Sequence, residues 1–558
     1  MKKSKKEVLK GIFDFGIAGL GYFSFFLVLY YVIFIAKGYY HSDCTDTIIW
    51  AQASYDAGAL MNPDFAYAGL IPFGGQLIML PFVALSGVGM MAQIIGMAIF
   101  SVLFVIAIVF LCRAMGFNYK WISVMVTSVL ILVSASAKLR EIFWGHIIYY
   151  SLGVFFLMVG FALVLKCIKA GDVFFAADVK DGKLNGAGSR AVNDKDVSMT
   201  LKRLAGCYIL LFVWTTLCSM NGVQSLTIYG IPVLGAVVAE RFFDFRTTFM
   251  DRRNLSRYYV MAVLMLGMVS GLVLGQFANG DIVAGYADAY SEFSTSSEWV
   301  SNFFDFFPKF FTLLGVKVKD DMLIYSVDGI FNLLRIVCAV VLITVPVIMA
   351  FLYRKFGEVS YRLMILIHHF LTLLILLGWV FGKLSSANWR LSPIVVTSVI
   401  LCVMFVKWII GSVEYKRLAA IVVIPVMCMV LITSKDIFTM DKQSKENEEL
   451  TNLAEYLEEN NLEYGYATFW QANIITLISD SDVKVRGIKF EEDGYMKRLY
   501  QTNRNWYGKA EGYDRYFVIF TEKEYMDYYL GNDNYEEPEE MLEFGDYRIM
   551  VYGHNLFD

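Results

Sequence analysis

The sequence predicts a polytopic α-helical membrane protein with about eleven transmembrane helices and a small C-terminal α/β domain. Three observations lead to this fold class. Of the 558 residues, 57% are hydrophobic and 18% are charged, and the mean hydropathy is +0.53, far from an ordinary soluble domain. Apolar runs of about 20 residues recur along residues 1–435. From about residue 436, charged residues interrupt these runs.

Each apolar run is long enough to cross a hydrocarbon core that is roughly 30 Å thick. The eleven runs are, approximately, residues 12–36, 90–111, 121–137, 147–165, 205–219, 224–239, 258–277, 325–352, 363–382, 391–411 and 418–434. The run 70–88 is also apolar, but Pro72, Gly74, Gly75 and Pro81 interrupt it. Because proline and paired glycines disrupt a regular helix, we predict an interfacial or re-entrant helix there.

The distribution of basic residues predicts the orientation. Cytoplasmic loops carry an excess of Lys and Arg. With a cytoplasmic amino terminus, the cytoplasmic segments hold 25 Lys and Arg residues and the external segments hold eight. The cytoplasmic segments are 1–11, 112–120, 166–204, 240–257, 353–362 and 412–417, and the external ones are 37–89, 138–146, 220–223, 278–324 and 383–390. We therefore predict a multi-pass protein of the cell membrane.

Two long loops differ in character. The cytoplasmic loop 166–204 contains a stretch rich in Gly, Asp and Lys, which predicts a mobile segment. The external loop 278–324 is aromatic and acidic, which predicts a segment that lies along the membrane surface.

Residues 436–558 are predicted to form a soluble α/β domain outside the cytoplasm. A charged amphipathic helix begins the region, and "DRYFVIFT" (514–521) and "YRIMVYG" (547–553) are typical of strands. The region contains no cysteine, so no disulfide framework is expected, which favours a bacterial cell envelope. The net charge of −4 and the lack of a long basic stripe argue against nucleic acid as a partner.

Acidic residues gather in the two external loops that follow the first and the third predicted spans. Asp43 and Asp46 lie just beyond the first span, together with His41. Glu141 is the one acid of the loop 138–146, and His146 lies five residues further on. A loop that leaves the membrane only has to be polar, so one carboxylate there costs little free energy. Carboxylates in both loops, however, indicate chemistry at the outer surface.

Three motifs together resemble the GT-C membrane glycosyltransferases, in particular the protein O-mannosyltransferase and aminoarabinose transferase branch. "SDCTDTIIWAQAS" is similar to the first acidic motif of that branch, and "AGLIPFGGQLIMLPFVALSGV" is similar to its Pro/Gly stretch. "ANWRLSPIVV" (387–396) resembles the element that begins a late span, with Arg390 and Pro393 kept and Trp389 before the arginine. The resemblance covers roughly residues 1–240 and 360–435.

The resemblance implies transfer of a sugar from a polyprenyl-phosphate carrier to an external acceptor, with inversion. It implies that Asp43, or next Asp46, is the general base and that Glu141 orients the acceptor or assists the base. His41, His146 and Trp389 are the further substrate-binding candidates. We assign no metal, although carboxylates of this kind could hold Mg²⁺ or Mn²⁺, and that alternative stays open.

Cations are needed to stabilise the leaving phosphate. Arg390 is the first candidate, because a guanidinium group matches phosphate oxygens with a fork of donors. Arg140 is a second candidate that could instead pair with Glu141. Arg335 lies inside a predicted span, where a charge is costly enough to suggest a function.

Two other classes of function are open at this point. A transporter or flippase would carry ionisable residues near the bilayer midplane, whereas these acids lie in external loops. A non-catalytic sensor or assembly protein of the cell envelope would depend on residues 436–558 and not on Asp43 or Glu141. If the protein is a glycosyltransferase, its acceptor is a cell-wall polymer, a glycan or a protein.

Overall fold

The computed structural model describes residues 5–67, 73–176, 178–180, 183–185, 194–243, 251, 254–279, 292–317, 322–412, 415–508 and 512–558. Among these residues, ten helices are long and apolar enough to cross a membrane, and a bent pair of shorter helices brings the number to eleven. The predicted number of about eleven spans is therefore confirmed. Parts of the predicted loops 166–204 and 278–324, together with Pro72, lie outside the described residues.

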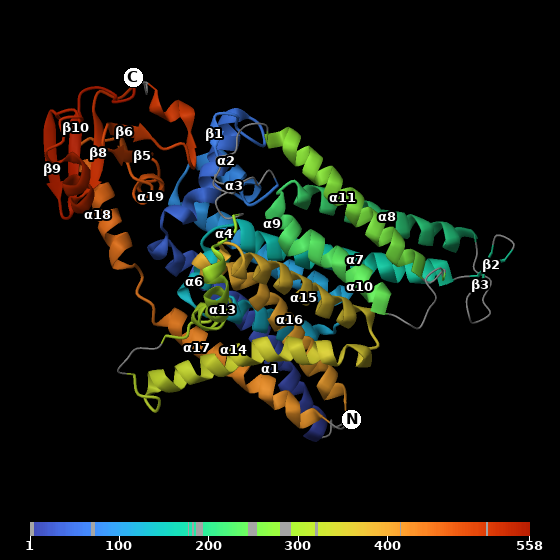
Figure 1. The fold of residues 1–558 in the computed structure, drawn as a ribbon. Helices are drawn as coiled ribbons and strands as arrows, with labels where there is room; N and C mark the ends of the chain where they lie inside the picture. Colours follow the sequence, from blue (N-terminus) through green and yellow to red (C-terminus); the bar gives the residue numbers. More distant parts are fainter. Residues whose placement is uncertain are drawn as a thin grey trace.

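The helices pack side by side as one bundle (Figure 1). The long ones are α1 (Lys5–Tyr30), α4 (Met90–Ala114), α7 (Tyr149–Ala176), α8 (Asp194–Ser219), α10 (Ile231–Phe243), α11 (Leu255–Asn279), α14 (Val327–Phe351), α15 (Val359–Val380), α16 (Ser392–Gly411) and α17 (Ala419–Phe438). Helix α10 reaches membrane-spanning length because α9 (Val223–Ser225) and the π turn η4 (Leu226–Gly230) extend it at its start.

The predicted span 121–137 ends earlier than its apolar run. Helix α5 (Tyr119–Leu132) stops, and the chain turns by 114° into α6 (Ala137–Trp144). The serines between them account for the break, because the Ser136 hydroxyl accepts a hydrogen bond from the Leu139 amide at 3.1 Å and begins a new helix. The bend turns α6, which carries Glu141, away from the direction of α5.

The interrupted run 70–88 forms a short helix, α3 (Gln76–Ser86), with Pro81 inside it. Eleven residues are too few to cross the bilayer, as the Pro/Gly pattern predicts.

Part of the long loop 278–324 forms α13 (Trp299–Leu313). Phe303, Phe304 and Phe307 of this helix are exposed, while Phe306 and Phe310 are buried.

The C-terminal region contains a six-stranded sheet in the order β6-β5-β4-β8-β10-β9. Its strands are β4 (Tyr464–Ala467), β5 (Lys484–Glu491), β6 (Gly494–Lys497), β8 (Tyr516–Thr521), β9 (Glu540–Phe544) and β10 (Tyr547–Tyr552). Strands β5, β4 and β8 are parallel, and the outer strands are antiparallel. Two helices, α18 (Lys445–Glu459) and α19 (Ala472–Ile478), accompany the sheet. Both predicted strands, now β8 and β10, are confirmed.

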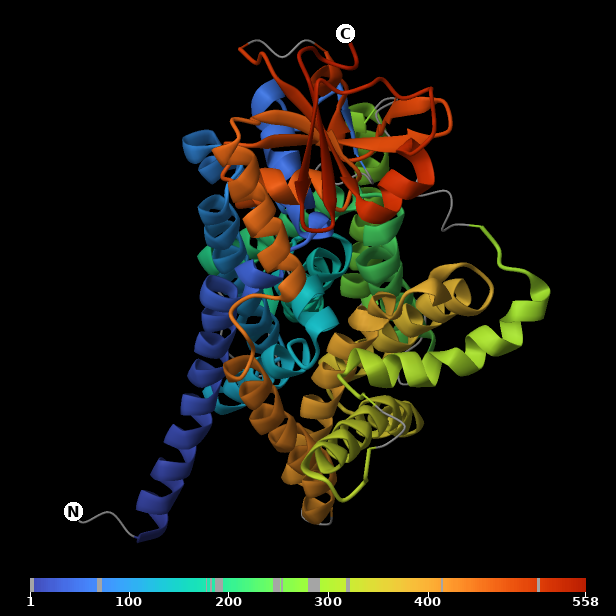
Figure 2. The ribbon, with the colours of Figure 1, turned by 90° about the vertical axis from the view of Figure 1, so that its left-hand side faces the viewer.

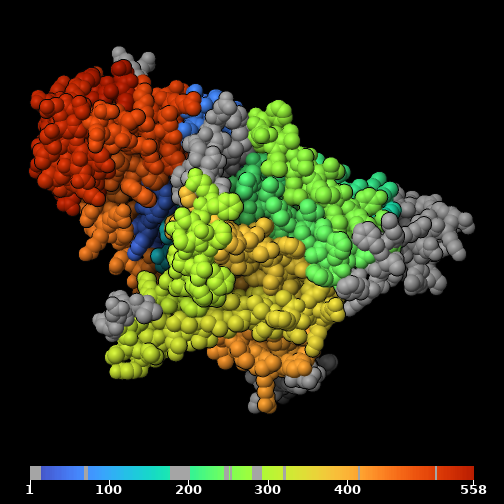
Figure 3. Space-filling model, in the orientation of Figure 1, coloured from blue at the N-terminus to red at the C-terminus, as the bar shows by residue number. Residues whose placement is uncertain are grey.

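The sheet lies against the loop that follows the first span. In Figures 1 and 2 the red and orange sheet stands beside α2 (Asp46–Ala57) and β1 (Phe65–Ala66), at the end of the bundle away from the start of α1. Strand β1 pairs antiparallel with β7 (Thr502–Asn503) of the C-terminal region. Figure 3 shows the C-terminal region as a body that stands out from the bundle. The loop and the C-terminal region therefore form a joint surface.

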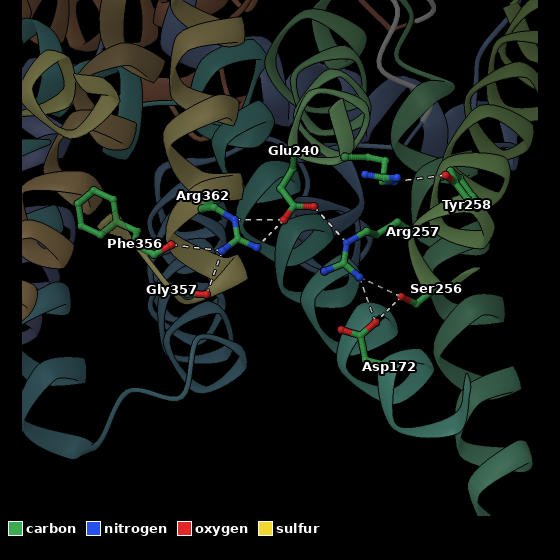
Figure 4. A network of polar contacts seen from close by, with 9 residues as sticks. Asp172, Glu240, Ser256, Arg257, Tyr258, Phe356, Gly357 and Arg362 are labelled. Carbon is green, nitrogen blue, oxygen red and sulfur yellow. Dashed lines mark hydrogen bonds and ion pairs between the residues drawn. The ribbon is translucent and has the colours of Figure 1, made fainter. Parts of the chain in front are cut away.

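A buried charge network ties four helices together at another end of the bundle (Figure 4). Glu240 of α10 is 1% exposed and accepts hydrogen bonds from Arg362 Nη2 of α15 at 2.7 Å and from Arg257 Nε of α11 at 3.1 Å. Arg257 Nη1 also lies 3.1 Å from Asp172 Oδ1 of α7. The network brings together three segments that the sequence predicts to be cytoplasmic.

Candidate active site

The acids of the first loop are placed by the way α1 ends. The helix passes into a π turn at Tyr31–Ile35 and then a 3-10 turn at Ala36–Tyr39, so the chain leaves the bundle in a compact path. A second 3-10 turn, Ser42–Thr45, carries Asp43, and α2 begins at Asp46. An acidic residue in the first turn of a helix interacts favourably with the unpaired amides there.

Charged contacts of Glu141 link the loop 138–146 to the loop that follows the first span. Glu141 Oε1 lies 3.4 Å from His41 Nε2, and its Oε2 lies 2.6 Å from Lys138 Nζ. Burial alone would raise the pKa of Glu141, but the hydrogen bond and charge of His41, followed by those of Lys138, lower it to about 2. The Cys44 sulfur and the Glu141 carboxylate both raise the pKa of His41 above its ordinary value. Glu141 is therefore ionised at neutral pH.

This depressed pKa predicts a loss of stability in acid. The Glu141 pKa falls from 4.5 to about 2 on folding, so its stabilisation is present above pH 4.5 and is lost as the pH falls toward 2. The effect is expected to be about 2 to 3 kcal/mol. Unfolding midpoints measured against pH should drop in this window for the wild type but much less for Glu141→Gln. Equal drops in the two proteins would contradict the assignment.

Asp43 and Asp46 differ in how far solvent reaches them. The Asp43 side chain is 44% exposed, and its Oδ2 lies 3.9 Å from His41 Nδ1. Asp46 is 5% exposed. Burial raises the pKa of Asp43 above its ordinary value, and His41 opposes this increase. Burial, followed by the neighbouring Asp43 charge, raises the pKa of Asp46 well above its ordinary value. Asp43 is the acid that an external substrate can reach.

The C-terminal region adds two residues that the sequence did not single out. Gln501 Oε1 accepts a hydrogen bond from the Trp50 indole of α2, and its backbone amide donates to the Ala66 carbonyl. Arg498 lies near enough to Asp43 and Asp46 to oppose the increase in both pKa values. No local motif around "KRLYQTN" distinguishes these residues from other polar positions of a soluble domain.

The three arginines predicted to bind phosphate do not come together. Arg140 Nη1 donates to the Ser134 carbonyl at 2.9 Å, and its guanidinium lies 5.6 Å from the centre of the Tyr31 ring. Arg335 of α14 pairs with Asp436 at the end of α17. Arg390 Nη1 donates to the Lys383 carbonyl at 2.7 Å and to the Ser386 hydroxyl at 3.0 Å. Each guanidinium therefore has a partner within the protein.

Trp389 contacts the Glu141 cluster through Lys138, whereas His146 is buried. The Lys138 ammonium is 4.6 Å from the centre of the Trp389 ring, so Lys138 connects this ring to Glu141. His146 is 4% exposed, and burial lowers its pKa to about 4. His146 is thus neutral at physiological pH and packed inside the protein.

A cavity of about 110 Å³ adjoins Glu141. Its lining includes three tyrosines, Tyr31, Tyr39 and Tyr40, and Met440 beside the carboxylate. Among the residues that the structure describes, no group of three or more His, Cys, Asp or Glu side chains is spaced to hold a metal ion. We derive no step through a metal.

The arrangement of the helices is the GT-C fold, and Asp43 and Asp46 lie in the loop at the end of its first span. Among solved structures, ArnT from Cupriavidus metallidurans bound to undecaprenyl phosphate is similar with a TM-score of 0.53 at 10% identity, over 94% of this chain and 97% of that one.

Two further solved structures are similar at a lower level. Apo ArnT from the same organism has a TM-score of 0.43 at 10% identity, over 98% of both chains. The oligosaccharyltransferase of Archaeoglobus fulgidus, in complex with zinc and sulfate, has a TM-score of 0.37 at 9% identity, over 84% of this chain and 62% of that one. No protein-family model and no curated protein matches the chain.

Proposed function

We propose that this protein is a membrane glycosyltransferase that moves a sugar from a polyprenyl-phosphate carrier to an acceptor outside the cytoplasm. The observation that carries the proposal is the pairing of a half-exposed carboxylate, Asp43, with the His41–Glu141–Lys138 cluster at the end of the first span. The similarity of the fold to an ArnT structure bound to undecaprenyl phosphate supports the choice of carrier.

Asp43 acts as the general base in the proposed mechanism. It takes the proton of an acceptor hydroxyl, and the oxygen attacks the anomeric carbon of the sugar. The bond between that carbon and the phosphate oxygen breaks, and the lipid phosphate leaves with the electron pair. Attack from the face opposite the phosphate inverts the configuration at the anomeric carbon.

The charged cluster around Glu141 holds the base in place. Glu141 pairs with both His41 and Lys138, and protonated His41 lies beside Asp43 and favours its ionised form. Burial raises the pKa of the neighbouring Asp46 well above its ordinary value, which disfavours a second negative charge next to the base. Trp389, stacked against Lys138, offers a ring face to a sugar or a lipid headgroup.

Turnover of the donor tests the proposal. The purified protein in lipid is incubated with a panel of radiolabelled polyprenyl-phosphate sugars, and release of the lipid phosphate is measured with and without candidate acceptors. Slow hydrolysis of one donor is expected even without the acceptor. If no donor is bound or consumed, the glycosyltransferase proposal fails.

A further inference from the structure

The proposed function leaves one cation near the acids, Arg498, without a role. Arg498 belongs to the C-terminal region, directly after β6, and is half-buried. His41 and Lys138 are paired with Glu141, but none of the ion pairs among the described residues includes Arg498. Its positive charge is therefore not balanced by a direct contact with a carboxylate.

Aromatic rings hold the Arg498 side chain in place. The centre of its guanidinium lies 4.2 Å from the centre of the Phe469 ring and 4.6 Å from that of Tyr500. Stacking of this kind fixes the plane of the guanidinium and leaves its N–H groups for an acceptor in that plane. Nη1 is buried and donates to none of the described residues. A buried donor without an acceptor is costly unless a ligand supplies one.

Backbone pairing fixes this part of the chain to the first loop. The Gln501 amide donates to the Ala66 carbonyl at 2.7 Å, and β7 pairs with β1 over the next two residues. The Asn505 side-chain amide donates to Asp64 Oδ2 at 3.0 Å. Arg498 is therefore held at a set distance from Asp43 by contacts that do not involve its own side chain.

We propose that Arg498 binds the phosphate of the polyprenyl-phosphate donor, so that the donor site lies between the first external loop and the C-terminal sheet. This inference rests on the proposed function. A guanidinium group with unoccupied N–H groups matches phosphate oxygens, whereas the arginines Arg140, Arg335 and Arg390 already donate to protein groups. The C-terminal region then contributes directly to donor binding.

The surroundings of Arg498 agree with an inverting displacement. Arg498 is near enough to Asp43 to lower its pKa electrostatically, but no ion pair between the two is present among the described residues. In the reaction, the base and the leaving phosphate lie on opposite faces of the sugar. A cation for the phosphate must therefore stand apart from the base and not contact it.

Ligand binding to the full-length protein in lipid nanodiscs tests the inference. The probes are a polyprenyl phosphate, the corresponding polyprenol and inorganic phosphate, each followed by intrinsic fluorescence or thermal stabilisation. Wild type should prefer the polyprenyl phosphate over the alcohol. Arg498→Gln should weaken binding of the phosphate form by about tenfold or more and leave binding of the alcohol unchanged. Arg498→Lys should recover part of the preference, because it restores the charge.

Arg486→Gln is the matched control. Arg486 also stacks on an aromatic ring, 3.9 Å from the centre of Trp506, but it does not contribute to the pKa shifts of Asp43 or Asp46. Unchanged phosphate preference in both Arg498 variants would overturn the inference and leave the proposed function standing. Stabilisation by inorganic phosphate alone, equal to that by the lipid, would assign the site to free phosphate and overturn the lipid assignment. Failure of wild type to bind any polyprenyl phosphate would overturn both proposals.

Discussion

Replacing Asp43 with asparagine is expected to reduce donor turnover by about 10²- to 10⁴-fold, the range that a general base contributes. Asparagine has almost the same shape but accepts no proton, so the acceptor hydroxyl attacks without activation. Asp43 makes no short hydrogen bond that the substitution would break, since its nearest ionic partner, His41 Nδ1, is 3.9 Å away. Donor binding should therefore persist, and a comparison of turnover with donor affinity separates the two effects.

Two further variants serve as controls for Asp43→Asn. Asp56→Asn removes a carboxylate from the same loop, at a position where Asp56 accepts a hydrogen bond from Gln52 and does not contact the cluster, so turnover should stay near wild type. Asp46→Asn changes a carboxyl whose charged form is disfavoured by burial, and it should cost much less than Asp43→Asn. A large loss in Asp46→Asn together with full turnover in Asp43→Asn would reverse the assignment of the base.

Replacing Glu240 with alanine is expected to destabilise the protein by about 3 to 5 kcal/mol, because removing one partner of a buried ion pair leaves the other charges uncompensated. Glu240 accepts from both Arg257 and Arg362, so Arg362 would lose its anion and the buried Arg257 would keep only Asp172. The measurement is chemical or thermal unfolding in a lipid-like detergent. Donor turnover at low temperature should change little, since the network (Figure 4) shares no residue with the acid cluster.

A graded series distinguishes loss of charge from loss of volume. Glu240→Gln keeps the size of the side chain and should still be strongly destabilising. Asp172→Asn alters the same network where the side chain is 41% exposed, so its effect should be below about 1 kcal/mol. Similar stabilities for Glu240→Gln and wild type would show that packing, and not charge pairing, holds these helices together.

Much of the fold could be predicted because the membrane imposes a simple length rule. A helix must satisfy its own backbone in lipid, so each span appears as a long apolar run. The Pro/Gly pattern of 70–88 likewise identified a helix too short to span, now α3. The end of α5 was harder to place, because Ser134 and Ser136 interrupt an otherwise apolar run only weakly.

The candidate site was only partly predictable. Asp43, His41 and Glu141 were expected at the same outer surface, and the structure brings them within one cluster. Lys138 was not singled out, although its spacing of three residues from Glu141 on a helix is a usable signal. Arg498 and Gln501 could not be found, because their contacts with the first loop depend on how the sheet docks, and hydropathy carries no information on that.

The β1–β7 pair also bears on biogenesis. It joins residues 65 and 66 to residues 503 and 502, so the first exit loop meets its partner only after residues 67–501 have been translated. Synthesis proceeds from the amino terminus, and the membrane helices are made first. A nascent or prematurely terminated chain would thus carry Asp43 and Glu141 but lack Arg498 and Gln501. Under the proposed role of Arg498, a chain that stops before residue 498 would be unable to capture the donor, and synthesis of residues 498–503 would make a new molecule competent.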